Sequence, residues 1–180
     1  MNYVKQHDLH FNNNYHAAFI LLFNSSLDTV FLVKNKYTKK WSVPGGWIDM
    51  KGYGRQINQC IDEKPIMCAL KEFYEETENK IPSDMMENKW LWWFVGSWTD
   101  IYHETDQGKQ MINWKYVVYF TKLQWLEIIM FDEKKIVNKE SETSECWWVK
   151  ISNLNNSNMS LRIQKTIWWI QKLLLEEEQS

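Results

Sequence analysis

The chain has few cysteines, and they form no pattern typical of a disulfide framework or a metal centre. The three residues Cys60, Cys68 and Cys146 are an odd number and include no Cys-x-x-Cys pair. The four histidines show no spacing typical of metal ligands either. We therefore expect neither a disulfide scaffold nor a structural zinc site, and a reducing compartment, the cytoplasm, fits this composition best.

Long apolar runs and an excess of one charge are also lacking. No stretch approaches the roughly 20 apolar residues of a membrane-spanning helix, and residues 1–8 lack the apolar core of a signal peptide. The formal net charge is only −2, so no basic excess favours non-specific binding of nucleic acid. We expect a protein without a membrane partner, folded as a single domain over residues 1–180.

Tryptophan, in contrast, is abundant, with 12 residues. Several stand side by side in strand-like or helix-like apolar runs, as at residues 90–93, 147–148 and 168–169. Large aromatic side chains in such runs usually contribute to the core. We therefore expect most of the tryptophans to fill the core or cover the faces of a sheet.

The most informative segment is an acidic run at residues 69–77. Its carboxylates Glu72, Glu75 and Glu76 are spaced i, i+3, i+4, which places them on one face of a helix. Three like charges so close would raise one another's pKa, and a cation that prefers oxygen ligands, such as Mg²⁺, would relieve the repulsion. The pattern indicates a metal site, and a solvated acidic face on an ordinary surface helix is the alternative.

The order of the predicted elements indicates an α+β fold. Pro44-Gly45-Gly46 is expected to interrupt regular structure, and residues 131–144 are expected to form a loop. The first two predicted strands and the fourth and fifth are expected to form hairpins. Helices are predicted at about residues 62–77 and 160–178, and strands at residues 16–23, 29–33, 41–43, 90–99, 111–121 and 146–149.

The segment from Gly45-Gly46 to the acidic helix resembles the signature of the Nudix hydrolase family. That signature places a glutamate seven residues before Arg-Glu-apolar-any-Glu-Glu, and here Glu63 precedes Lys71-Glu72-Phe73-Tyr74-Glu75-Glu76 by that spacing. Upstream, Gly45-Gly46 resembles the Gly-Gly opening, with Asp49 where the family often has an acid. The resemblance implies a Nudix-type α/β/α sandwich with a mixed central sheet and a C-terminal helix.

The chain departs from the signature at three points. Between Gly46 and Glu63 it has about eleven more residues than the pattern's five, and we assign the insertion to residues 51–61. Lys71 replaces an arginine, so the charge is kept and the planar two-pronged grip is lost. Glu78 stands in place of the last glycine. We expect Asn79 to adopt the left-handed conformation instead, because asparagine tolerates it well.

The resemblance also implies an activity, which is Mg²⁺-dependent hydrolysis of a diphosphate linkage in a nucleoside diphosphate joined to another moiety, with Mn²⁺ as a substitute metal. It assigns catalysis and metal binding to Glu72, Glu75 and Glu76, together with the carbonyl group of Gly46. Supporting roles fall to Glu63 and Lys71, and to Glu140 or Glu142 in the loop before the late strand. For each of these two loop glutamates a solvated surface charge is the alternative.

The substrate is left open by the sequence. Trp41 and Trp47 flank the Gly-Gly turn and could stack on a base, and Arg55 in the insertion could bind a phosphate. A nucleotide-type small molecule is the expected ligand. Capped RNA, in a decapping reaction, is one alternative, and a catalytically inactive Nudix-fold module that binds nucleotide or RNA is another. The oligomeric state is also open, with a homodimer among the alternatives.

Overall fold

The structure is a computed structural model that describes residues 2–5, 16–48, 65–82, 92–105 and 108–180. In residues 2–5, 92–105 and 108–114 only the backbone is described. The strands are β1 (Asn2–Lys5), β2 (Ala17–Phe23), β3 (Thr29–Asn35), β4 (Trp41–Ser42), β5 (Gly45–Trp47), β6 (Trp92–Thr105), β7 (Gly108–Lys122), β8 (Lys134–Lys135) and β9 (Thr143–Lys150). The helices are α1 (Pro65–Thr77), α3 (Trp125–Ile128) and α4 (Leu161–Gln179), with a 3₁₀ turn at Ile151–Asn153.

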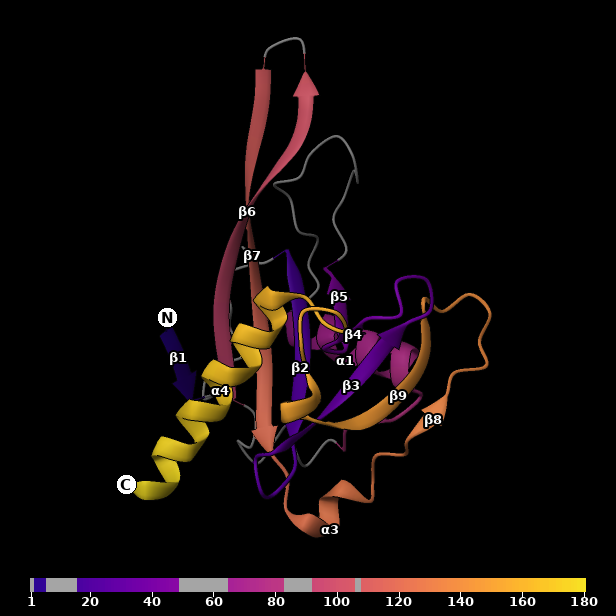
Figure 1. The fold of residues 1–180 in the computed structure, drawn as a ribbon, viewed down its shortest axis with the longest axis vertical. Coiled ribbons are helices and arrows are strands. Elements are labelled where there is room, and N and C mark those ends of the chain that lie inside the picture. The colour runs from indigo at the N-terminus through magenta and orange to yellow at the C-terminus, as the bar shows by residue number, and fades with distance from the viewer. Residues whose placement is uncertain (1, 6–15, 49–64, 83–91, 106–107) are drawn as a thin grey trace.

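The described strands form one mixed sheet in the order β1-β6-β7-β2-β3-β9-β8. The pair β2 and β7 is parallel, and the other neighbours are antiparallel. The long β6–β7 hairpin extends beyond the rest of the molecule (Figure 1). None of the described helices is long and apolar enough to cross a membrane.

Helices cover both faces of the sheet, with α4 in front and α1 behind in Figure 1. Alternating residues of β2 separate the two cores, because successive side chains of a strand point to opposite faces. Ala18, Ile20 and Leu22 pack with α1, whereas Ala17, Leu21 and Phe23 pack on the side of α4. The predicted α/β/α sandwich with a mixed sheet and a C-terminal helix is confirmed.

The sheet opens between β2 and β3, and this opening places the Gly-Gly segment. The two strands pair only at Phe23 and Val30. Nearer its start, β2 pairs instead with β5, where Ala18 lies opposite Gly46. The expectation that residues 44–46 interrupt regular structure holds at Pro44, which separates β4 from β5, and is wrong for the two glycines, which take up the free edge of β2 and form a strand.

The end of α1 also differs from the expectation. Glu78 itself adopts the left-handed conformation, with φ of 55°. Asn79 is buried, and its side-chain amide donates hydrogen bonds to the carbonyl oxygens of Thr77 and Asp132, at 3.0 and 3.1 Å. Asn79 thus ties the end of the acidic helix to the segment that follows α3.

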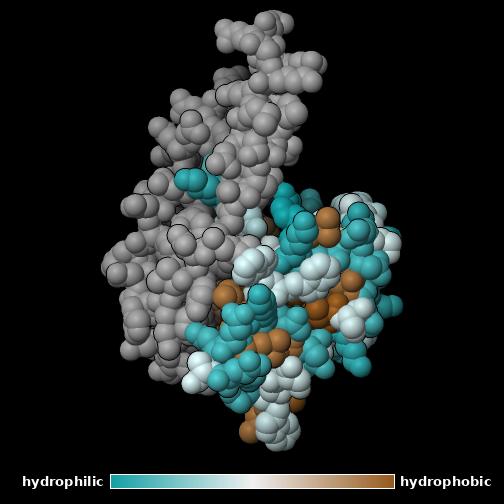
Figure 2. Space-filling view, turned by 60° about the vertical axis from the view of Figure 1, so that its left-hand side comes forward, coloured by the Kyte–Doolittle hydropathy of each residue, from teal (hydrophilic) through white to brown (hydrophobic). Residues whose placement is uncertain are grey.

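For the tryptophans whose side chains are described, the expectation holds only in part, since Trp41 and Trp148 pack partly buried against the two cores. None of the seven tryptophans whose side chains are described is buried, and Trp47, Trp125, Trp147, Trp168 and Trp169 are exposed. Phenylalanines and tyrosines take the core positions, including Phe31, Phe73 and Tyr119. On the face drawn in Figure 2, hydrophilic residues cover much of the coloured surface, with smaller hydrophobic areas between them.

The remaining elements follow the sequence-based expectations in part, since β6 and β7 are longer than predicted and the short elements β1 and α3 were not expected. The acidic helix ends at Thr77, and α4 begins after Ser160, whose hydroxyl group accepts a hydrogen bond from the backbone of Ile163. Residues 131–144 contain the short strand β8, which pairs with β9 and was not expected.

Candidate active site

A cavity of about 880 Å³ lies where α1, β5, the segment before β9 and the start of α4 meet. Glu72, Glu75 and Glu76 line it from α1. The helix holds them there because its opposite side, including Phe73 and Ala69, is fully buried against the sheet. The prediction that these three carboxylates lie on one face of a helix is confirmed.

The Gly-Gly segment lies directly against the acidic helix. The backbone N–H of Gly45 donates a hydrogen bond to Oε2 of Glu76 at 2.9 Å. A Cβ atom added at Gly46 would lie 2.7 Å from the carboxyl carbon of Glu72. One added at Gly45, where φ is 151°, would lie 2.3 Å from the carbonyl oxygen of Ala18. Gly45 therefore requires glycine because of the β2 backbone, whereas a side chain at Gly46 would displace the carboxylate of Glu72.

The environment of Glu76 opposes its ionised form. Burial raises the pKa of this carboxyl to about 8, and the charges of Glu72, Glu142 and Glu75 act in the same direction. The hydrogen bond from Gly45 lowers it only in part. The pKa is raised because the carboxylate is shielded from water and has negative groups around it. A cation bound there would stabilise the ionised form of Glu76.

The segment before β9 brings further carboxylates to the cavity. Glu140 and Glu142 line it together with Asn138 and Ser141. Glu142 lies close enough to Glu76 for its charge to raise the pKa of that group. The two loop glutamates singled out in the sequence therefore share a cavity with the acidic helix, more than 60 residues earlier in the chain.

The opposite wall of the cavity is of a different character. It combines the aromatic pair Phe19 and Tyr116, whose rings meet edge to face at 6.2 Å, with Arg162 and Thr166 of α4. The hydroxyl groups of Tyr116 and Thr166 lie 3.4 Å apart. These residues were not predicted to belong to the site. Their sequence shows only the alternation of side chains along β2 and β7, which does not tell which helix covers each face of the sheet.

Of the other predicted residues, one lines the cavity, two lie elsewhere, and the rest are outside the described part of the chain. Trp47 lines the cavity. Trp41 does not, because its ring packs below the ammonium group of Lys34, 5.1 Å from the ring centroid. Lys71 is on the exposed side of α1 and does not line the cavity. Outside the described residues lie Asp49, Arg55, Glu63 and the insertion at 51–61.

The donor set of the cavity fits a divalent metal ion that prefers oxygen ligands. Five carboxylates and the Gly46 backbone line one space, and one of these carboxylates is half-buried among like charges. In the part of the chain described, however, no three His, Cys, Asp or Glu side chains are already arranged to hold an ion. Glu72, Glu75 and Glu76, with the carbonyl of Gly46, are the residues that would hold it.

Comparisons with known proteins agree with this geometry. The NUDIX domain family matches residues 14–170. A search of curated proteins gave no match. Among solved structures, the chain is similar to the NUDIX domain of Shewanella oneidensis NrtR complexed with ADP ribose, with 15% identity, a TM-score of 0.52 and coverage of 91% of this chain and 90% of that one.

Two further structures are similar at low identity. The first is a bifunctional NMN adenylyltransferase/ADP ribose pyrophosphatase from Francisella tularensis, complexed with AMP and a Mn ion. It shows 18% identity, a TM-score of 0.51 and coverage of 93% of this chain but 43% of that one. The second is the Escherichia coli dihydroneopterin triphosphate pyrophosphohydrolase, with 12% identity, a TM-score of 0.50 and coverage of 86% and 94%. Because the family match covers most of the chain and these likenesses agree on the fold, the chain belongs to the Nudix family.

Proposed function

We propose that this enzyme hydrolyses a diphosphate linkage in a nucleoside diphosphate joined to another moiety. The observation that carries the proposal is the meeting of Glu72, Glu75 and Glu76 with Glu142 beside the Gly45-Gly46 strand in one cavity. Mg²⁺ is the proposed metal and Mn²⁺ a substitute, which is consistent with the Mn ion in the Francisella tularensis neighbour. We also propose a single domain over residues 1–180, located in the cytoplasm.

The chain's own residues would prepare the site for a doubly charged substrate. When bound, a divalent metal would neutralise phosphate oxygens and lower the pKa of a bound water molecule. Glu72, Glu75 and Glu76 would hold the metal, and Gly45 would keep the Glu76 carboxylate oriented through its 2.9 Å hydrogen bond. Glu142 and Glu140 would be the candidates to accept the proton of the attacking water, because their carboxylates line the same space.

The opposite wall would bind the nucleoside part of the substrate. Phe19 and Tyr116 offer aromatic surface for a base or sugar, and the hydroxyl pair of Tyr116 and Thr166 offers hydrogen bonds. Arg162 supplies a positive charge that can contact a phosphate or another anionic group. A nucleotide-type ligand is consistent with the ADP ribose and AMP bound by the two neighbours.

One observation favours hydrolysis of an mRNA cap as a second candidate. Trp47 lines the cavity and is 46% exposed, so its ring offers an aromatic surface on which a base could stack. The third candidate, a module that binds nucleotide or RNA without cleaving it, is disfavoured because simple binding does not require five carboxylates around one cavity.

A release assay over a panel of substrates would test the proposal. The panel comprises ADP-ribose, nucleotide sugars, dinucleoside polyphosphates, nucleoside triphosphates and capped RNA, each with Mg²⁺ and with a chelator, and the products are separated by chromatography. Mg²⁺-dependent release of a nucleoside monophosphate is expected for at least one diphosphate. Binding of these ligands without turnover under any metal condition would instead identify the binding module.

A further inference from the structure

Lys36 holds the acidic segment before β9 in place. It follows the last residue of β3, and its ammonium group donates hydrogen bonds to the carbonyl oxygens of Lys139 and Ser141, both at 2.8 Å. Its backbone N–H also donates to the carbonyl oxygen of Glu142 at 2.8 Å. One residue therefore makes three hydrogen bonds to a segment more than 100 residues later in the chain.

These bonds act on the part of the segment that is not held by the sheet. On one side, the ladder between β3 and β9 ends at Asn35 and Thr143. On the other side, the backbone of Ile136 bonds to that of Ser144. Between these points, residues 138–142 make local hydrogen bonds, such as those from Glu140 and Ser141 to Asn138 and from the adjoining Thr143 to the hydroxyl group of Ser141. Lys36 is thus the described residue that joins the tip of this segment to the rest of the protein.

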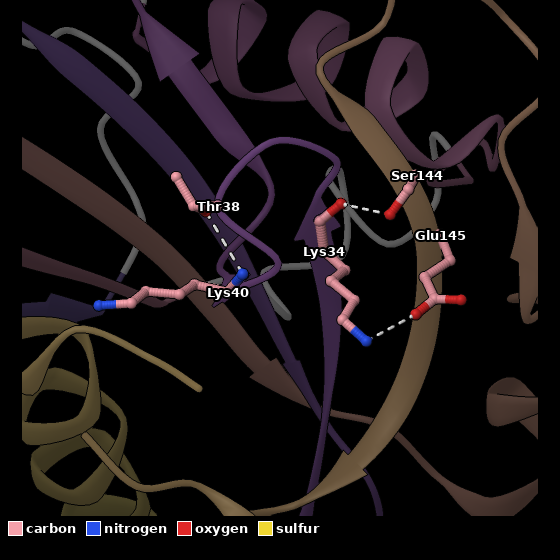
Figure 3. Close-up of polar contacts among 5 residues, drawn as sticks. All are labelled: Lys34, Thr38, Lys40, Ser144 and Glu145. Atoms are coloured by element: carbon pink, nitrogen blue, oxygen red, sulfur yellow. Dashed lines mark hydrogen bonds and ion pairs between the residues drawn. The ribbon is translucent and has the colours of Figure 1, made fainter. Parts of the chain in front are cut away.

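The position of Lys36 is itself well defined. The side-chain oxygen of Asn35 accepts hydrogen bonds from the backbone of Tyr37 and Thr38, each at 2.9 Å, and so closes the turn after β3. Within β3, Lys34 forms an ion pair with Glu145 at 3.1 Å. The hydroxyl group of Ser144 donates a hydrogen bond to the carbonyl oxygen of Lys34 (Figure 3). The strand β3 and its following turn therefore form a firm support for Lys36.

The segment that Lys36 holds carries Glu140 and Glu142 into the cavity. The charge of Glu142 reaches Glu76, so a shift of the segment would change the carboxylate set around the metal and the substrate. Groups that orient residues of a metal site in this way typically contribute about 10- to 100-fold in metal affinity or activity.

We propose that Lys36 is a positioning residue, which sets the place of Glu142 in the active site by fixing the backbone of residues 139–142. The inference rests on the proposed function, since it assigns Glu142 a role in the metal-bound reaction. Lys36 does not line the cavity and acts only through the segment that it holds.

A double-mutant cycle tests this role. Lys36→Met keeps the length and the apolar part of the side chain but removes the three ammonium donors. Lys36→Met and Glu142→Gln are made singly and together, and kcat, KM and the Kd for Mn²⁺ are measured. A matched control is Lys40→Met, because Lys40 lies on the same turn, and its side chain extends away from Ser144 and Glu145 (Figure 3).

The expected result is a loss that depends on Glu142. With Glu142 present, Lys36→Met should lower kcat and Mn²⁺ affinity about 10-fold or more, with KM changed less than kcat. In the Glu142→Gln background the same change should cost less than about twofold. Lys36→Arg keeps the donors and should stay close to the wild type, as should Lys40→Met, and thermal unfolding checks that each variant is folded.

The remaining outcomes separate the two proposals. Equal losses in both backgrounds, or no loss with Glu142 present, would overturn the positioning role. A wild-type protein that cleaves none of the diphosphates would overturn the proposed function alone, and the Mn²⁺ affinities would still decide the role of Lys36. A wild-type protein that binds no Mn²⁺ would overturn both. Were Lys36→Met to unfold, the Lys36→Arg and Lys36→Gln variants would provide the comparison in both backgrounds.

Discussion

The backbone N–H of Gly45 donates a hydrogen bond to Oε2 of Glu76 at 2.9 Å, which joins strand β5 to the acidic helix α1. The bond holds one oxygen of a carboxylate that burial and three neighbouring glutamates make costly to ionise. It therefore orients this group before any ligand arrives. At the neighbouring Gly46, the lack of a Cβ atom leaves room for the carboxylate of Glu72, so two consecutive glycines lie against two carboxylates of one helix.

Removing the charge of Glu75 or Glu76 should abolish most of the activity without unfolding the protein. Glu75→Gln and Glu76→Gln keep the shape of the side chain, and turnover should fall by roughly 10²-fold or more, as for the loss of an electrostatic stabiliser. The matched control is Glu78→Gln, because Glu78 is exposed and does not line the cavity. Initial rates at saturating Mg²⁺ measure the effect, and wild-type rates in the first two variants would contradict the assignment.

The metal-free protein should become less stable as the pH rises. The carboxyl of Glu76 titrates near 4.5 when unfolded and has a pKa of about 8 when folded. Between these values the folded state binds more protons than the unfolded state, so the free energy of unfolding decreases with increasing pH. The decrease is complete once the pH exceeds the folded pKa.

Thermal unfolding in the presence of a chelator, from pH 5 to pH 9, measures this dependence. The Glu76→Gln variant should show a flatter profile, because the amide does not titrate. Mg²⁺ should raise the melting temperature most at high pH, where the carboxylate is ionised. A melting temperature of the chelated wild type that rises over this range would show that Glu76 is not the controlling group.

The two glycines should respond differently to alanine. Gly45→Ala should impair folding, because the new Cβ would meet the backbone of β2 and the positive φ is unfavourable for alanine. In Gly46→Ala, the close atoms belong to the end of the Glu72 side chain, which can move. That variant should fold but bind Mn²⁺ more weakly, because Glu72 is displaced.

Urea unfolding and Mn²⁺ titration on both proteins separate the two effects. The prediction for Gly46 fails if Gly46→Ala binds Mn²⁺ as the wild type does. The prediction for Gly45 fails if Gly45→Ala has an unchanged unfolding midpoint.

Arg162 should contribute to substrate binding more than to the chemical step. Arg162→Met removes a charged donor from the wall opposite α1 and should raise KM by about 10-fold while kcat changes little. The control is Lys165→Met, which removes an exposed charge one turn further along α4. Steady-state kinetics on the best diphosphate substrate measure both constants. A fall in kcat at constant KM would assign Arg162 to the reaction itself.

Local sequence was sufficient to predict much of this protein. The spacing of Glu72, Glu75 and Glu76 and the apolar positions between them predicted α1, because both depend only on the period of a helix. The apolar runs predicted β2, β3, β7 and β9, and the acidic motif indicated the family. The resemblance to the family then implied the sandwich, with which the α+β order is consistent, and the family match and the fold bear this out.

Only the tertiary structure decided which distant segments share the cavity. The Gly45-Gly46 segment forms a strand because β2 offers it an unpaired edge, and this depends on the gap between β2 and β3. Tyr116 and Arg162 meet because α4 packs on the face of the sheet opposite α1. Glu142 and Glu76 line the same cavity although they lie on separate elements, and Lys36 bonds to the segment of Glu142 from more than 100 residues earlier. Periodicity and propensity are local properties, whereas these contacts depend on the packing of elements far apart in the chain, which a single sequence does not reveal.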